Sequence, residues 1–99
     1  MENTVSTGPK WTQDQAINYE CARECITDLM GIFSSSIADE KALALPDETK
    51  IKDLLRLRTA LAHERMALRL KDHDRIAEIR STYGAQIRAC RAADRQQAT

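Results

Sequence analysis

Apolar residues recur every three or four positions from residue 14 to about residue 43, which predicts one long amphipathic helix. The stripe consists of Tyr19, Ala22, Ile26, Leu29, Phe33 and Ile37. Thr12 is suited to cap the amino end of this helix, because Gln15 follows it at the spacing of a capping box. Gly31 and the run Ser34–Ser36 weaken the pattern. A kink or break at these residues is therefore the alternative to a continuous helix.

A second apolar pattern covers residues 47–70 and is separated from the first by Pro46, which disfavours helical geometry at the residue before it. Its leucines recur every seven positions, which indicates an amphipathic helix. They are Leu54, Leu61 and Leu68. The polar segment 71–74 interrupts the pattern, which then resumes. The resumed stripe consists of Ile76, Ile79, Tyr83, Ile87 and Cys90. The pattern fits two helices, but it also fits one helix of more than forty residues.

These elements predict an all-α fold: a small antiparallel bundle of about three helices with a long first helix. Short connections make neighbouring helices antiparallel, which places the acidic residues of the first helix beside the arginine-rich second one. We expect residues 1–10 to be a flexible tail, residues 11–94 a single helical domain and residues 95–99 a frayed tail. The positions predicted to be substantially buried are Tyr19, Ile26, Leu29, Phe33, Leu54, Leu61, Leu68, Ile76 and Tyr83.

Charge is divided unevenly along the chain although the net charge is zero. Residues 1–49 hold three basic groups against nine acids, whereas residues 50–99 hold twelve basic groups against six acids. Such asymmetry suggests a basic surface for nucleic acid or an acidic partner, and a separate acidic surface. The alternative is that the two halves attract each other within one fold.

The basic half predicts the candidate binding residues. Arginine suits phosphate because its planar guanidinium donates two charge-assisted hydrogen bonds at once. An aromatic ring near a guanidinium would allow a base to stack, as in proteins that bind single strands. The candidate residues for nucleic-acid or partner binding are Arg58, Arg65, Arg69, Arg80, Tyr83, Arg88 and Arg91. The competing interpretation is a solvated face whose arginines pair with nearby acids.

The sequence does not support catalysis, a cofactor or a metal site. Cys21 and Cys25 lie four residues apart, but the histidines that would complete a zinc site, His63 and His73, are ten residues apart. Packing is the better interpretation of the cysteines, which are often buried. We therefore expect a protein that is not an enzyme and has no catalytic or metal-binding residues. An odd number of cysteines and no long apolar run indicate a cytoplasmic protein without a membrane span.

The first helix has an apolar stripe that is widest around Gly31, where Met30, Ile32 and Phe33 are all apolar. Two shorter helices would leave part of so wide a stripe uncovered, and an uncovered apolar patch marks an interaction surface. A homodimer is therefore among the expectations.

Two parts of the chain carry a resemblance to known proteins. They are Trp11–Ala16 with Cys21–Asp28, and Lys71–Arg80 with Tyr83–Gly84. They resemble small accessory proteins of conjugative plasmids and integrative elements. Because such elements encode anti-CRISPR inhibitors, antitoxins and replication regulators, the resemblance implies an interaction role but transfers no functional residue.

The leading functional hypothesis is a non-enzymatic anti-CRISPR inhibitor. It would act through the arginine-rich surface on a CRISPR effector protein or on a nucleic acid, with single-stranded DNA among the candidates. The alternative is a dimeric helical regulator that binds RNA or DNA in plasmid copy control or as an antitoxin.

Overall fold

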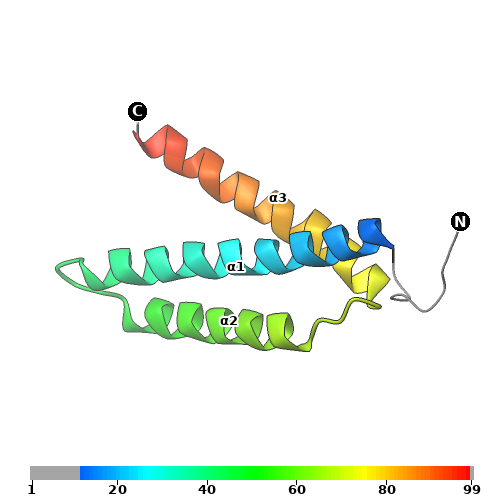
Figure 1. Cartoon of the computed structure of the whole chain (residues 1–99). Helices are drawn as coiled ribbons and strands as arrows, with labels where there is room; N and C mark the ends of the chain where they lie inside the picture. Colours follow the sequence, from blue (N-terminus) through cyan, green and yellow to red (C-terminus); the bar gives the residue numbers. More distant parts are fainter. Residues whose placement is uncertain (1–11, 99) are drawn as a thin grey trace, which may run out of the picture.

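Three α-helices account for nearly all of residues 12–98, the part of the chain that the computed structural model describes (Figure 1). They are α1 (Gln13–Lys41), α2 (Glu48–Ala67) and α3 (His73–Ala98). The predicted all-α fold with a long first helix is confirmed. The tail predicted for residues 1–10 lies outside the described residues.

Helix α1 begins with the predicted capping box. The backbone N–H of Gln15 donates to Oγ1 of Thr12 (3.1 Å), and the backbone N–H of Thr12 donates to Oε1 of Gln15 (2.8 Å). These two bonds satisfy backbone donors that the first turn of a helix otherwise leaves unpaired. The helix then continues through Gly31 and Ser34–Ser36 without a break, so the alternative of an interrupted helix is wrong.

The turn between α1 and α2 is fixed by Glu40, a buried carboxylate. Its Oε2 accepts the backbone N–H of Asp47 (3.0 Å), and its Oε1 lies 3.2 Å from Nζ of Lys50. These contacts, the Asp47 hydrogen bond first, hold the pKa of Glu40 below its ordinary value. Asp47 itself caps α2 by accepting the backbone N–H of Lys50 (3.1 Å).

Helix α2 ends at Ala67, three residues before the predicted end at residue 70, because Leu68 leaves helical geometry with φ −65° and ψ 133°. This extended residue turns its side chain into the core, where it is 6% exposed. Oδ2 of Asp72 then accepts the backbone N–H of Arg69 (2.9 Å) and closes the connection. Two helices therefore form, and the alternative of one long helix is wrong. Helix α3 continues to Ala98, beyond the predicted domain end at residue 94.

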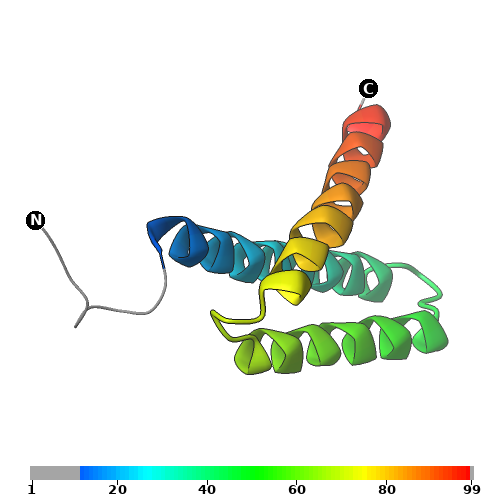
Figure 2. The ribbon, with the colours of Figure 1, turned by 90° about the vertical axis from the view of Figure 1, so that its right-hand side faces the viewer.

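Helix α1 lies between the other two helices. Helix α2 runs antiparallel beside it, whereas α3 crosses it and diverges toward the carboxyl end (Figures 1 and 2). No Cα of α2 lies within 8 Å of a Cα of α3, so the two outer helices pack on α1 and not on each other. The bundle is therefore open on the side where α2 and α3 separate.

The core lies where all three helices come closest. Its buried members are Ala22, Ile26, Leu29, Leu61, Leu68, Ile76, Ile79 and Ile87. The predicted core positions Tyr19, Phe33 and Tyr83 are half-buried and pack against it, and Leu54 is also half-buried. No helix within residues 12–98 combines the length and the apolar character that crossing a bilayer requires.

Candidate interaction surfaces

Two of the candidate arginines, Arg58 and Arg65, lie in the seam between α1 and α2. Nη1 of Arg58 donates to Oγ of Ser34 (2.9 Å), and Nη1 of Arg65 donates to Oγ1 of Thr27 (2.9 Å). Both side chains are half-buried. The prediction that acidic α1 would lie beside arginine-rich α2 is correct for the helices, but these two arginines bond to hydroxyl groups and not to carboxylates.

Tyr83 belongs to a network that links α2 to α3. Its Oη donates to Oε1 of Glu64 (2.7 Å), and Arg75 makes an ion pair with the same carboxylate. Nη2 of Arg75 also donates to Oη of Tyr83 (3.2 Å), and its guanidinium lies 5.9 Å from the centre of the ring. Burial, followed by the bond to Glu64, raises the pKa of Tyr83 above its ordinary value. The tyrosine is thus half-buried and already paired with an arginine.

The other candidate arginines are exposed and lie apart from the seam. Nη1 of Arg80 donates to Oδ1 of Asn18 on α1 (2.6 Å), and Nη2 of Arg91 lies 3.7 Å from Oδ2 of Asp28. Arg69 sits in the α2–α3 connection, whereas Arg88 and Arg91 lie on the diverging half of α3. The seven candidate residues therefore occupy separate places and do not form one continuous surface.

An apolar groove opens between α2 and α3, which we call the α2–α3 groove. Its volume is about 430 Å³. Its lining consists of Leu29, Phe33, Leu57, Ala60, Leu61, Glu64, Tyr83 and Gln86. The Glu64–Tyr83 bond spans the groove where the two helices are still close. Leu57 stands on its wall with 51% of its surface exposed. The sequence analysis missed this site, although Leu57 is an apolar residue one turn from the core position Leu61.

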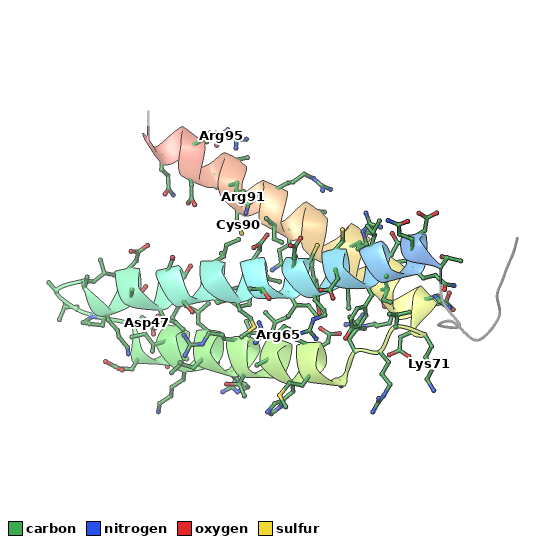
Figure 3. The ribbon with its side chains drawn as sticks, in the orientation of Figure 1. Asp47, Arg65, Lys71, Cys90, Arg91 and Arg95 are labelled. Atoms are coloured by element: carbon green, nitrogen blue, oxygen red, sulfur yellow. The ribbon has the colours of Figure 1, made fainter. Side chains whose placement is uncertain are left out.

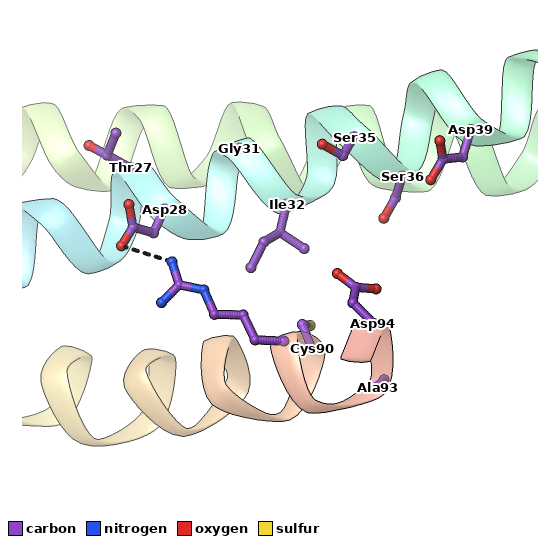
Figure 4. Close-up of a pocket in the computed structure, with 11 residues that line it drawn as sticks. Thr27, Asp28, Gly31, Ile32, Ser35, Ser36, Asp39, Cys90, Ala93 and Asp94 are labelled. Atoms are coloured by element: carbon purple, nitrogen blue, oxygen red, sulfur yellow. Dashed lines mark ion pairs between the residues drawn. The ribbon is translucent and has the colours of Figure 1, made fainter. Parts of the chain in front are cut away.

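A second opening, the α1–α3 cleft, lies on the other side of α1, where α3 rises away from it (Figure 4). Its volume is about 450 Å³. Ile32 projects into it, and Asp28 and Arg91 face each other across it (Figure 4). Asp39 and Asp94 add two further carboxylates to its rim. This opening has a charged rim, in contrast to the α2–α3 groove.

Gly31 borders the α1–α3 cleft from the middle of α1. A Cβ built on this residue would meet no atom within 4 Å, and the residue is exposed. Glycine in a helix interior is less stable than alanine by about 0.5–1 kcal/mol. The packing of the single chain therefore does not explain why α1 carries a glycine here.

The three cysteines are free thiols and are half-buried. Burial, followed by the nearby charge of Asp28, raises the pKa of Cys25, so this thiol is a poor nucleophile. Within residues 12–98, no three His, Cys, Asp or Glu side chains are grouped so that they could hold a metal ion.

No protein-family model, no curated protein and no solved structure matches this chain. Any functional assignment therefore depends on the residues of the surfaces themselves.

Proposed function

We propose that this chain is a non-catalytic helical interaction protein that binds an amphipathic helix of a protein partner in the α2–α3 groove. From the resemblance to accessory proteins of mobile elements, we further propose that the partner is a CRISPR effector protein in the cytoplasm and that binding inhibits it. The observation that carries the proposal is the open groove between two helices that pack on α1 but not on each other.

The groove lies where a fourth helix would pack. Packed helices lie about 8–10 Å apart, and α2 and α3 both pack on α1 while their Cα atoms stay more than 8 Å from each other. A helix laid over Leu29 and Phe33 would complete a four-helix arrangement, the common closed form of such bundles. Amphipathic helices bind in this way when their apolar face enters an apolar groove.

The ends of the groove differ in polarity, which gives a bound helix a preferred direction. Glu64 and Tyr83 close one end with a hydrogen-bonded pair, and Gln86 adds an amide group farther along α3. The wall near Leu57 and Ala60 is apolar. A few polar groups at fixed positions beside an apolar surface provide orientation and specificity.

Two of the candidate arginines already have partners within the fold. Arg58 and Arg65 donate to hydroxyl groups of α1. If either arginine bound a phosphate instead, its bond to α1 would be lost and the α1–α2 seam would be weaker. This arrangement favours a protein partner over nucleic acid at α2.

Expression in a host with an active CRISPR system tests the proposal. We expect phage to escape restriction when the wild-type chain is present and to be restricted again when Leu57→Arg replaces it, because a charge would then stand in the groove. The control is Thr59→Arg, an exposed change on the same helix that lies away from the groove. Full restriction in the presence of the wild-type chain would rule out the inhibitor role against that system.

A second candidate function, a dimeric regulator that binds RNA or DNA, has one observation in its favour. Arg88, Arg91 and Arg95 are exposed at successive turns of α3, on the half that diverges from α1. Gel shifts with single- and double-stranded oligonucleotides at two salt concentrations test it. Binding through these arginines would weaken steeply as salt rises, because neutralised phosphates release counterions.

A further inference from the structure

We propose that two copies of this chain associate through the side of the molecule opposite to the α2–α3 groove. We call this side the charged face and define it by two rows of residues. The acidic row on α1 consists of Glu20, Glu24 and Asp28, and the arginine row on α3 consists of Arg88, Arg91 and Arg95.

The groove and the charged face lie on opposite sides of α1. Phe33 lines the α2–α3 groove and Ser35 lines the α1–α3 cleft. Two residues along an α-helix correspond to a rotation of about 200°. A second copy bound at the charged face therefore leaves the groove open for the partner proposed above.

The two rows lie side by side on this face. Arg91 and Asp28 approach each other to 3.7 Å across the cleft, which places one member of each row at the same level. Residues three or four positions apart share one side of a helix. Glu24 and Glu20 therefore extend the acidic row from Asp28, while Arg88 and Arg95 extend the arginine row in both directions from Arg91. Figure 3 shows Arg91 and Arg95 projecting from the diverging half of α3.

Most of this charge has no side-chain partner within residues 12–98. The Asp28 and Arg91 side chains are 50% and 60% exposed, so their ion pair is screened by water and is weak. Four other members of the rows have no ion pair or hydrogen bond within residues 12–98. They are Glu20, Glu24, Arg88 and Arg95.

An acidic row beside a basic row is self-complementary under two-fold symmetry. If a second copy is turned by 180° about an axis between the rows, its arginine row lies over the acidic row of the first copy, and the converse contact forms as well. The rows overlap at two levels, because α1 and α3 run in the same direction from the Asn18–Arg80 contact to the Asp28–Arg91 contact. Asp28 is level with Arg91 and Glu24 with Arg88, so each copy would supply an acid and an arginine at both levels.

Charge complementarity favours a second copy over another partner. A surface of one sign would match one row and repel the other, whereas an identical copy matches both. The net charge of the chain is zero, so two copies approach without overall repulsion.

Gly31 provides a place where two backbones can approach. It lies at the edge of the charged face with no atom of its own chain within 4 Å of a Cβ position. Ser35, one turn farther along α1, is also small and exposed. Glycine is the usual residue where another backbone comes close, so a helix of the second copy can lie on α1 at this point.

Two charge reversals test the pairing. We expect the wild-type chain to show twice its mass of 11.2 kDa in analytical ultracentrifugation at high micromolar concentration and low salt. Glu24→Arg alone and Arg88→Glu alone should each give monomers, because like charges then meet at both symmetric contacts. An equimolar mixture of the two variants should recover a heterodimer, since each new charge then meets its opposite. Lys52→Glu, an exposed reversal on α2, is the control and should leave the dimer intact.

A second variant blocks the face sterically and leaves its charged residues unchanged. Ser35→Trp places a bulky ring on an exposed position of α1 one turn from Gly31, where a helix of the second copy would lie, and it should also give monomers with unchanged helical circular dichroism. A wild-type chain that remains at 11.2 kDa would overturn the proposal. A mixture of Glu24→Arg and Arg88→Glu that stays monomeric would also overturn it. Neither result affects the groove, which Leu57→Arg tests separately.

Discussion

The hydroxyl of Tyr83 donates a 2.7 Å hydrogen bond to the carboxylate of Glu64 and so joins α3 to α2, two helices whose backbones do not touch. Arg75 reinforces the link by pairing with the same carboxylate. The link lies at the α2–α3 groove, which Glu64 and Tyr83 both line.

Replacing Tyr83 by phenylalanine removes the hydroxyl and keeps the ring. We expect the free energy of unfolding to fall by about 1 kcal/mol, the usual net value of one hydrogen bond, as measured by urea denaturation. Because the pKa of Tyr83 is raised in the folded chain, this contribution is present below the ordinary tyrosine pKa and disappears as pH rises through the raised value. A variant as stable as the wild type at pH 7 would contradict the role of the link.

The Glu40 contacts predict how the fold responds to acid. The pKa of Glu40 is lower in the folded chain than its ordinary value of 4.5, so the ionised carboxylate stabilises the fold. That contribution is present above pH 4.5 and is lost as pH falls through the lowered pKa. We expect Glu40→Gln to be less stable than the wild type at pH 7 and the difference to shrink in acid. Thermal unfolding of both proteins at several pH values measures this, and a constant difference would refute it.

Leu61 and Leu45 allow the same substitution to be compared at a buried and at an exposed position. Leu61 is 7% exposed and packs among the three helices, whereas Leu45 in the α1–α2 turn is 89% exposed. Leu61→Ala should lower the free energy of unfolding by about 2–5 kcal/mol, because it leaves a cavity. Leu45→Ala should change it by less than about 0.5 kcal/mol, as surface changes usually do. Equal effects in chemical denaturation would mean that the register of α2 is wrong.

Replacing Arg65 and Arg69 in turn distinguishes an arginine that stabilises the fold from one that faces solvent. Arg65→Ala removes the bond to Thr27 in the α1–α2 seam, and we expect a loss of about 1 kcal/mol. Arg69 takes part in the α2–α3 connection through its backbone N–H and carbonyl groups, which alanine retains, so Arg69→Ala should leave the melting temperature unchanged. A larger loss for Arg69→Ala than for Arg65→Ala would contradict the assignment.

The sequence predicts those parts of the fold that depend on local chemistry. The Thr12–Gln15 capping box and the end of the first helix before Pro46 follow from residues close together in the chain. The same pattern left open whether the second and third helices are one. The heptad spacing also predicted that Leu61 and Leu68 are buried, which is confirmed, although Leu68 reaches the core as an extended residue after α2 and not as part of a helix.

The arrangement of side chains across helices could not be predicted in this way. Arg58 and Arg65 lie on one stripe, and nothing local indicates that hydroxyl groups 24 and 38 residues away would accept their bonds. Tyr83 was expected to share a surface with Arg80, but its partners are Arg75 and Glu64, because the crossing of α3 over α1 decides which residues meet. The groove depends on the same crossing, which periodicity does not specify.

The contacts of α3 also determine the order in which the chain folds. Helices α1 and α2 meet through residues close in sequence, such as Glu40 and Asp47, whereas α3 returns to α1 across 62 positions at Asn18 and Arg80. Closing a longer loop carries a larger entropic penalty, so we expect the α1–α2 hairpin to form first and α3 to dock on it afterwards. During translation, Ile26 and Leu29 therefore stay without their cover from Ile76 and Ile79 until α3 has left the ribosome, and in that interval the nascent chain is open to chaperones and proteases.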